Sequence, residues 1–200
     1  MRITGGQWVN KSIAVPSGFQ VRPTPSKVRQ AIFNSLGPCI DGLSVLELFA
    51  GSGTLSFECL SRGAKSALAV ELSSKHAGYI RRNSQMLNAC IELRVQCALK
   101  AIKQLAESGR TFDFICADPP YGEKTASGQR SESWAQRLLD DSNLVRIMNP
   151  EGLLLLGHTK RDVVEWVLPW QERKTLKHGD TWIRILEISL GAGGRLQCVN

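Results

Sequence analysis

The sequence lacks the features that would place the chain in a membrane, in an oxidising compartment or among zinc-binding proteins. No stretch approaches the roughly 18 to 20 apolar residues that cross a bilayer, and the first six residues contain no apolar signal core. Six cysteines are scattered without a C-x-x-C pair, and none of the three histidines is spaced to complete a zinc site. Internal repeats and low-complexity segments are absent. The sequence therefore predicts a cytoplasmic protein with reduced cysteines and no bound metal.

What the chain does contain is enough apolar sequence for one core and an excess of positive charge. It has 200 residues, of which 42% are hydrophobic, and a formal net charge of +7. The first 35 residues contain five basic residues and no acidic residue. This imbalance favours a surface that meets phosphates, and the alternative is a solvated basic surface without a partner.

The order of apolar segments indicates strands that alternate with helices. Residues 1–21 carry turn signals typical of a short β-hairpin, and a helix is expected from Thr24 to Leu36, before Gly37-Pro38. Further strands are expected at 44–49, 66–71, 93–97, 112–117 and 152–158, further helices at 55–62, 74–88, 98–107, 132–146 and 160–167, and a final antiparallel pair at 171–177 and 181–190.

Such alternation predicts an α/β fold with a doubly wound, mostly parallel, Rossmann-like sheet. We expect residues 1–40 to form an N-terminal hairpin and helix extension, and residues 41–200 to form the ligand-binding domain. Ligands of these sheets bind beyond the carboxyl ends of the strands, so the informative positions are Phe49–Thr54, Glu71, Cys97-Ala98 and Asp118–Tyr121.

The first motif is a glycine turn between a strand and a helix, and it is flanked by two acids. Its pattern is G-S-G-T rather than G-x-G-x-x-G, with Ser56 at the place of the third glycine. Glu47, at the end of the strand, suits a ligand with a cationic amino group, and Glu71 can accept hydrogen bonds from both ribose hydroxyls. Together they predict a site for S-adenosylmethionine, while the alternative is a tight turn with surface acids. The candidate cofactor-binding residues are Glu47, Phe49, Ala50, Gly51, Gly53, Thr54, Glu71, Cys97 and Ala98.

The second motif is Asp118-Pro119-Pro120-Tyr121, directly after the fourth expected strand. Two prolines stiffen the backbone and remove two N–H donors, so the Asp118 carboxylate and the Pro119 carbonyl can both accept hydrogen bonds from an –NH₂ group. The Tyr121 ring can stack on a planar base, a contact worth about 1–3 kcal/mol. These four residues are the candidate catalytic residues, and the alternative is a rigid turn without a ligand.

In this order and spacing, the two motifs resemble class I methyltransferases with the (D/N)PP(Y/F) signature. The N-terminus narrows the resemblance, because R-x-x-G-G at residues 2–6 and R-P-T-x-x-x-V-R-x-x-x-F-N at residues 22–34 are similar to the bacterial 16S ribosomal RNA guanine-N2 methyltransferases. The resemblance extends to His178-Gly179-Asp180-Thr181. It implies S-adenosylmethionine as donor, a guanine flipped out of its stack as acceptor, and ribosomal RNA as partner. Candidate RNA contacts are Arg22, Thr24 and Arg29, of which the two arginines are expected to contact phosphates or bases; the alternative for them is helix-start electrostatics and solvation.

Some positions depart from that family. Residues 9–12 lack a second basic pair that often follows the hairpin tryptophan, and Cys97-Ala98 stand where many methyltransferases place an Asp that reads adenine. Residues 122–133 are either a lid over the base or an idle loop. Trp8 either stacks on RNA or packs in the hairpin, whereas Trp166, Trp170 and Trp182 are expected to be core or packing residues.

Other functions fit the sequence less well. A DNA amino-methyltransferase normally needs a target-recognition insertion, for which 200 residues leave little room. The basic N-terminus argues against a methyltransferase of protein glutamine, and the two intact motifs argue against an RNA-binding assembly factor without activity. A nicotinamide dehydrogenase has no use for D-P-P-Y. We expect a monomer, and the target nucleotide stays open, as does the choice between naked RNA and an assembled particle.

Overall fold

The computed structural model describes residues 1–16, 25–37, 40–120 and 133–189, and it divides into two compact units. The first unit contains Met1–Ala101, and the second runs from Ile102 to Leu196. The N-terminal segment and the first helix therefore group with the first strands of the chain. The expected boundary near residue 40, between an N-terminal extension and a ligand-binding domain, stays a prediction. The two compact units are instead divided between Ala101 and Ile102.

The N-terminal segment reverses direction over residues 1–13. Ile3 N–H donates to the Lys11 carbonyl (3.0 Å), Ile13 N–H donates to the Met1 carbonyl (2.7 Å), and an isolated antiparallel bridge joins Arg2 to Ser12. Ile3 and Ile13 are buried, so their side chains anchor the reversal. The expected hairpin is thus present as a single bridge rather than two strands, and its last residues, 17–21, lie outside the described part of the chain.

The first helix, α1 (Ser26–Leu36), ends where the sequence predicts and begins two residues after the expected start. Its buried apolar residues recur at helical spacing, namely Val28, Ile32, Phe33 and Leu36. Gly37 follows with φ 61° and donates its N–H to the Phe33 carbonyl, which closes the last turn.

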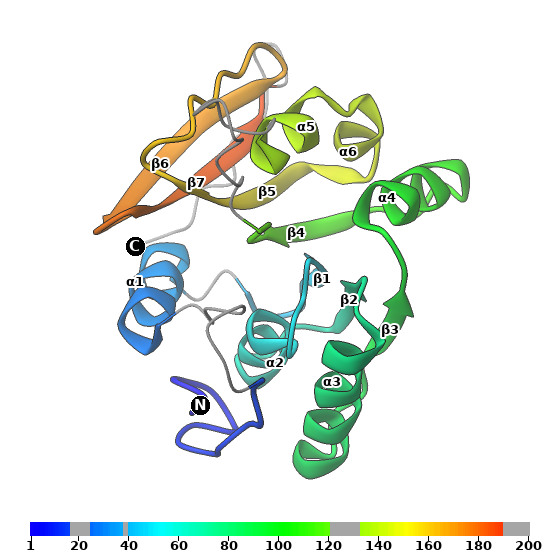
Figure 1. Ribbon diagram of the computed structural model, residues 1–200, viewed down its shortest axis with the longest axis vertical. Helices are drawn as coiled ribbons and strands as arrows, with labels where there is room; N and C mark the ends of the chain where they lie inside the picture. Colours follow the sequence, from blue (N-terminus) through cyan, green and yellow to red (C-terminus); the bar gives the residue numbers. More distant parts are fainter. Residues whose placement is uncertain (17–24, 38–39, 121–132, 190–200) are drawn as a thin grey trace, which may run out of the picture. The chain divides into compact units, whose positions relative to one another are not determined.

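The sheet of the first unit is parallel, with the strand order β3-β2-β1. The elements are β1 (Ser44–Leu48), α2 (Thr54–Ser61), β2 (Ser66–Glu71), α3 (Ser74–Leu87) and β3 (Glu92–Val95), followed by α4 (Ala98–Glu107), which crosses the division between the units. α2 contacts β1 and β2, and α3 contacts β2 and β3 (Figure 1). The strands β1 and β2 are buried almost throughout, as expected of a covered parallel sheet.

The second unit contains the strand order β4-β5-β7-β6. Its elements are β4 (Phe112–Ala117), α5 (Trp134–Asp140), α6 (Ser142–Arg146), β5 (Met148–Thr159), β6 (Trp170–His178) and β7 (Thr181–Ile188). β4 and β5 run parallel, whereas β7 is antiparallel to both β5 and β6. Figure 1 shows α5 and α6 beside β5, which both helices contact. The predicted antiparallel pair at the end of the chain is confirmed.

Two helix predictions are wrong in the second unit. The single helix expected at 132–146 is broken at Asp141, whose backbone is extended (φ −80°, ψ 105°) and whose carboxylate accepts the Asn143 N–H to start α6. The helix expected at 160–167 does not form. Val163 and Val167 are 79% and 80% exposed, so the apolar stripe that favoured a helix has no core to pack against.

The tryptophans of the second unit differ in their surroundings. Trp170 is buried, and its Nε1–H donates to the Leu139 carbonyl (3.0 Å), so the predicted core position is confirmed. Trp166 and Trp182 are only half-buried, and both rings lie under the Arg184 guanidinium, at 5.0 and 4.9 Å from their centroids. They are therefore packing residues, as predicted, in cation–π contacts at the surface and not in the core.

The described cysteines differ in their exposure. Cys59 and Cys116 are buried, Cys97 is half-buried and Cys90 is exposed. Among the helices of the described residues, none is both long and apolar enough to span a bilayer.

Candidate functional site

The glycine turn after β1 has left-handed backbone at alternate residues: Phe49 (φ 56°), Gly51 (φ 56°) and Gly53 (φ 75°). Ala50 N–H donates to the Val70 carbonyl of β2 (3.0 Å), which fixes the turn at the sheet edge. A Cβ on Gly53 would approach Phe57 Cε2 at 2.9 Å, whereas a Cβ on Gly51 would meet nothing within 4 Å. Gly53 therefore packs against α2, and Gly51 presents bare backbone to open space where a ligand can approach.

Glu71 joins the glycine turn to the loop after β2. Its Oε2 accepts the Gly51 N–H (2.7 Å), and its Oε1 accepts the Ser73 N–H (2.8 Å). The carboxylate is largely buried, with His76 Nδ1 at 3.6 Å from Oε1. Each carboxylate oxygen has a second lone pair, so the bonds to the backbone hold the group in place and leave acceptor capacity for ribose hydroxyls.

Leu72 is a candidate that the sequence analysis missed. It follows Glu71 at the end of β2, and its side chain is 71% exposed. An exposed large apolar side chain beside a polar turn gives a planar ring a surface to pack on. The sequence feature that could have indicated Leu72 is its position directly after the last residue of a strand, where ligands of such sheets bind.

Glu47 lies inside the end of β1 and is almost fully buried. Its two oxygens accept the N–H groups of Leu55 (3.1 Å) and Ser56 (2.9 Å), in the first turn of α2. Burial raises the pKa of Glu47 to about 7, against the opposing effect of these hydrogen bonds. The carboxylate therefore stabilises the start of α2, and its predicted contact with a cationic amino group remains a prediction.

Asn83 is a second residue that the sequence analysis missed. This fully buried side chain of α3 donates Nδ2–H to the carbonyls of Ala14 (2.9 Å) and Ser52 (3.1 Å), and its Oδ1 accepts the Ala14 N–H (2.8 Å). One amide therefore ties the N-terminal segment to the glycine turn. Asn83 follows Ala77 and Ile80 on the buried stripe of α3, and a polar residue on such a stripe was the available signal.

The turn after β3 is held beside β2, since Gln96 N–H donates to the Glu71 carbonyl (3.0 Å). Cys97 is half-buried, and Ala98 is buried as the first residue of α4. Both thus lie in the first unit with the glycine turn. Their predicted contact with adenine remains a prediction.

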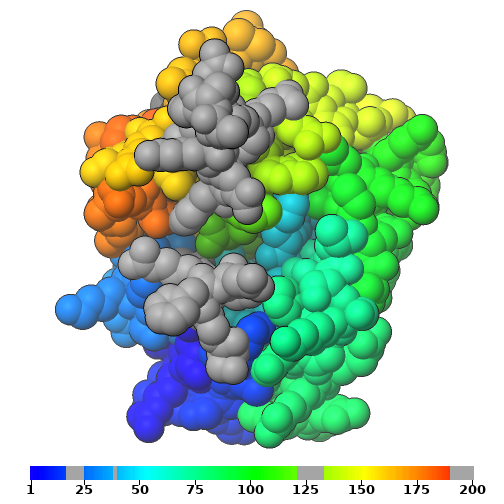
Figure 2. Space-filling model, in the orientation of Figure 1, coloured from blue at the N-terminus to red at the C-terminus, as the bar shows by residue number. Residues whose placement is uncertain are grey.

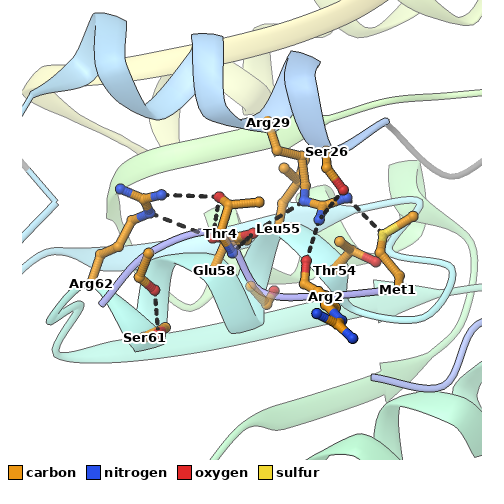
Figure 3. A network of polar contacts seen from close by, with 12 residues as sticks. Met1, Arg2, Thr4, Ser26, Arg29, Thr54, Leu55, Glu58, Ser61 and Arg62 are labelled. Carbon is orange, nitrogen blue, oxygen red and sulfur yellow. Dashed lines mark hydrogen bonds and ion pairs between the residues drawn. The ribbon is translucent and has the colours of Figure 1, made fainter. Parts of the chain in front are cut away.

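Arg29 is part of a buried network, shown in Figure 3. Its side chain has no exposed surface, and its Nε lies 3.1 Å from Glu58 Oε1. The guanidinium also donates to the Arg2 carbonyl, the Met1 sulfur and Ser26 Oγ. The predicted contact of Arg29 with RNA phosphate is therefore wrong, because these partners enclose its charge inside the first unit. The other two candidate RNA contacts, Arg22 and Thr24, lie outside the described residues.

Glu58 is the centre of this network. It accepts hydrogen bonds from the Thr4 N–H (2.8 Å) and Thr4 Oγ1 (3.1 Å), and Arg62 Nε lies 3.5 Å from its Oε2 (Figure 3). Trp8 adds a further link, since its N–H donates to Ser61 Oγ (2.9 Å), although its ring is half-exposed. These contacts attach the N-terminal segment to α2, the helix that follows the glycine turn.

The surface of the first unit retains other cations. Arg2, Lys11 and Lys27 are exposed. In Figure 2 the dark blue N-terminal residues form part of the molecular surface beside the teal residues of α3, to which Asn83 bonds them. Among the described N-terminal residues, the exposed positive charge therefore resides on these side chains, whereas the charge of Arg29 is buried.

In the second unit, Asp118 directly follows the last residue of β4, Ala117, which pairs with Leu156 of β5. Asp118 is half-buried, Pro119 is buried and Pro120 is exposed. Tyr121 lies outside the described residues. The strand thus ends where predicted and delivers the carboxylate of Asp118 to the carboxyl end of β4.

The neighbouring His158 has a structural role. It is buried, its Nε2 accepts the Arg184 Nε–H (3.1 Å), and its Nδ1 lies 2.8 Å from the Thr159 carbonyl. Burial lowers the pKa of His158, which agrees with a neutral ring that donates from Nδ1. The hydrogen bond from Arg184 to His158 thus holds β7 against the carboxyl-terminal end of β5.

Comparison with known proteins identifies the family. The sequence model of the family described as "Conserved hypothetical protein 95" matches residues 1–187. The chain belongs to this family. It is 36% identical over 121 residues to the ribosomal RNA small subunit methyltransferase D of Escherichia coli K12, covering 60% of each chain. It is also 36% identical over 124 residues to the enzyme of the same name from Haemophilus influenzae, covering 60% of this chain and 64% of that one. The matches thus span less than two thirds of these relatives.

A solved structure extends the similarity to nearly the whole chain. The protein titled "Putative methyltransferase yhhF from Escherichia coli" superposes with a TM-score of 0.75 at 26% identity, covering 96% of this chain and 99% of that chain. Two predictions are therefore confirmed: the resemblance to small-subunit ribosomal RNA methyltransferases, and the Rossmann-like class I methyltransferase fold.

Proposed function

We propose that the protein transfers a methyl group from S-adenosylmethionine to the exocyclic N2 amino group of a guanine in small-subunit ribosomal RNA. The observation that carries the proposal is the end of β4, which Asp118-Pro119-Pro120 follows directly, in a chain whose family includes relatives named methyltransferases. The relatives' names support ribosomal RNA as the substrate. The choice of guanine N2 rests on the two N-terminal motifs.

The first unit offers the features that the methyl donor requires. Gly51 presents open backbone, Glu71 is fixed beside it as an acceptor for ribose hydroxyls, and Leu72 offers apolar surface for the adenine ring. When bound, S-adenosylmethionine supplies a methyl group already activated by its sulfonium, so no nucleophilic side chain is needed. The residues of the first unit therefore bind and orient the donor.

The second unit offers acceptors for the amino group that receives the methyl. The Asp118 carboxylate and the Pro119 carbonyl accept its two hydrogens, which aims the nitrogen lone pair away from both acceptors. Orientation of this kind can lower a barrier by roughly 7–11 kcal/mol in favourable cases. As the N–CH₃ bond forms and the C–S bond breaks, the nitrogen loses a proton, and the Asp118 carboxylate is placed to accept it.

RNA contact is assigned to the exposed cations of the N-terminus. Arg2, Lys11 and Lys27 replace Arg29 in this role, and each phosphate that they neutralise should steepen the dependence of binding on salt. Arg22 and Thr24 stay in the proposal on the strength of the motif alone.

The experiment supplies tritiated S-adenosylmethionine with small-subunit ribosomal RNA, assembled small subunits, DNA and a release factor, and then maps the modified atom. We expect label on guanine N2 of the RNA. We also expect Asp118→Ala to lose transfer while S-adenosylmethionine still binds, because the donor residues lie in the first unit. Label on DNA or on the release factor would replace the proposed substrate, and transfer by Asp118→Ala at the wild-type rate would remove Asp118 from the chemistry.

A further inference from the structure

We propose that Gly157 is a positioning residue for methyl transfer: the absence of a side chain at this position leaves the space in which the Asp118 carboxylate is held. The inference rests on the proposed function, since it assigns the orientation of the carboxylate that accepts the amino group. It concerns two residues of the second unit only.

The register of the sheet places the two residues side by side. Ala117 pairs with Leu156 in the parallel ladder of β4 and β5, so the next residues along each strand are Asp118 and Gly157. A Cβ built on Gly157 would overlap Asp118 Oδ1 and would lie 3.1 Å from Asp118 Cγ. The same Cβ would lie 3.4 Å from Asp118 Cα, which is an ordinary contact. A methyl group at residue 157 would thus displace the carboxylate and leave the backbone where it is.

The backbone of Gly157 does not explain the glycine. Gly157 is not among the glycines with positive φ, and it pairs with Ile183 inside the β5–β7 ladder. Other residues adopt such a conformation, and glycine in the interior of a strand weakens it. The space occupied by the Asp118 carboxylate is therefore the feature that requires glycine here.

Gly152, in the same strand, provides a contrast. A Cβ on Gly152 would approach the backbone oxygens of Asn149 (2.9 Å), Phe112 (3.2 Å) and Asp113 (3.3 Å). An alanine there would strain the backbone and would not touch Asp118. Gly152→Ala is thus the matched control for the loss of a glycine in β5 without a change at the carboxylate.

The test compares the full-length wild type with Gly157→Ala, Gly152→Ala, Asp118→Ala and the double variant Asp118→Ala/Gly157→Ala. For each we would measure the melting temperature, the Kd for S-adenosylmethionine, and kcat and KM with the small-subunit RNA substrate. Gly157→Ala should keep or raise the melting temperature and keep the Kd, while kcat falls about 10- to 100-fold, as expected when a positioning contact is misplaced by around an ångström. Gly152→Ala should lower the melting temperature and keep kcat in the folded fraction.

The double variant isolates the route through Asp118. Once the carboxylate is gone, the added methyl group should cost nothing further, so the small residual transfer of the double variant, measured with excess enzyme over long incubation, should match that of Asp118→Ala. If Gly157→Ala keeps the wild-type kcat, or if its effect multiplies that of Asp118→Ala, the inference is overturned while the proposed function stands. If Asp118→Ala itself transfers at the wild-type rate, the proposed role of Asp118 fails first.

A crystal structure of Gly157→Ala gives a readout that does not depend on the RNA substrate. The Asp118 carboxylate should have rotated to another rotamer, with its Cα unmoved. A carboxylate in the wild-type position, beside an accommodated alanine, would overturn the inference whatever the activity.

Discussion

Replacing Arg29 by methionine should cost the fold several kilocalories per mole, although the residue is basic and lies in a motif that favours RNA contact. Methionine fills much of the volume but removes the charge that faces Glu58 at 3.1 Å. Glu58 stays fully buried, and of its cationic partners only Arg62, at 3.5 Å, is retained. Breaking one partner of a buried pair typically costs about 3–5 kcal/mol, because the other charge is left in a low-dielectric interior.

The measurement is the free energy of unfolding of the full chain, followed by urea and by heat. For a chain of this length the expected loss corresponds to a fall in melting temperature of roughly 6–20 °C, at about 2–4 °C per kcal/mol. The matched control is Lys27→Met, which removes an exposed cation from the same helix and should change stability by no more than about 0.5 kcal/mol.

A second variant separates the charge from the packing. Adding Glu58→Gln to Arg29→Met removes the uncompensated charge and keeps an acceptor for Thr4, so part of the lost stability should return. In RNA titrations Lys27→Met should lower the slope of log K against log salt, and Arg29→Met, measured well below its lowered melting temperature, should not. Equal stability losses for Arg29→Met and Lys27→Met would refute the buried role of Arg29.

Three further predictions concern the two units separately. Because the pKa of Glu47 is about 7 in the folded protein and lies above its unfolded value, Glu47 is mostly protonated at pH 5.5 and ionises by pH 7.5. The Kd for S-adenosylmethionine, measured by calorimetry, should therefore be lower at pH 7.5 than at pH 5.5. If Glu47→Gln shows the same change in Kd with pH, Glu47 does not contact the ligand and only stabilises α2. Asn83→Leu should weaken S-adenosylmethionine binding by about tenfold and expose residues near Ala14 to hydrogen exchange, whereas the exposed neighbour Gln85→Leu should do neither. The pKa of His158 is lowered below its unfolded value, so the unfolded chain binds a proton more readily than the folded chain does. The free energy of unfolding should therefore fall as the pH falls from 7 to 5, and His158→Gln should flatten that decline. An unchanged slope in His158→Gln would contradict the neutral buried ring.

Most of the fold could be predicted from the sequence because most helices bury a periodic set of apolar residues and the central strands are apolar runs that are buried nearly throughout. The β1–α2–β2–α3 succession and β4 appear within a residue or two of the expected bounds. The failures lie where local pattern and tertiary packing disagree. Residues 160–167 have helical spacing but no core beneath them, and Asp141 has a carboxylate that caps a new helix in the middle of an expected one.

The site was predictable in its motifs and less so in its support. Strand ends and glycine turns mark Glu71, Gly51 and Asp118, since the fold class fixes where ligands bind. The charge of Arg29 favours RNA contact, whereas its position predicts burial, because it shares a helical face with Ile32 and Phe33, both buried. Gly157 could not be found from sequence, because the need for glycine arises from a carboxylate on another strand.

The buried amide of Asn83 couples the N-terminal segment to the glycine turn. Ala14 and Ser52 share one side chain, so neither backbone segment can shift without altering the hydrogen bonds of the other. A ligand that restricts the motion of the glycine turn should also restrict the motion of the chain around residue 14. By thermodynamic linkage, a nucleic acid that binds the segment around residue 14 should likewise restrict the glycine turn. The nucleic acid and S-adenosylmethionine should therefore each lower the Kd of the other by the same factor.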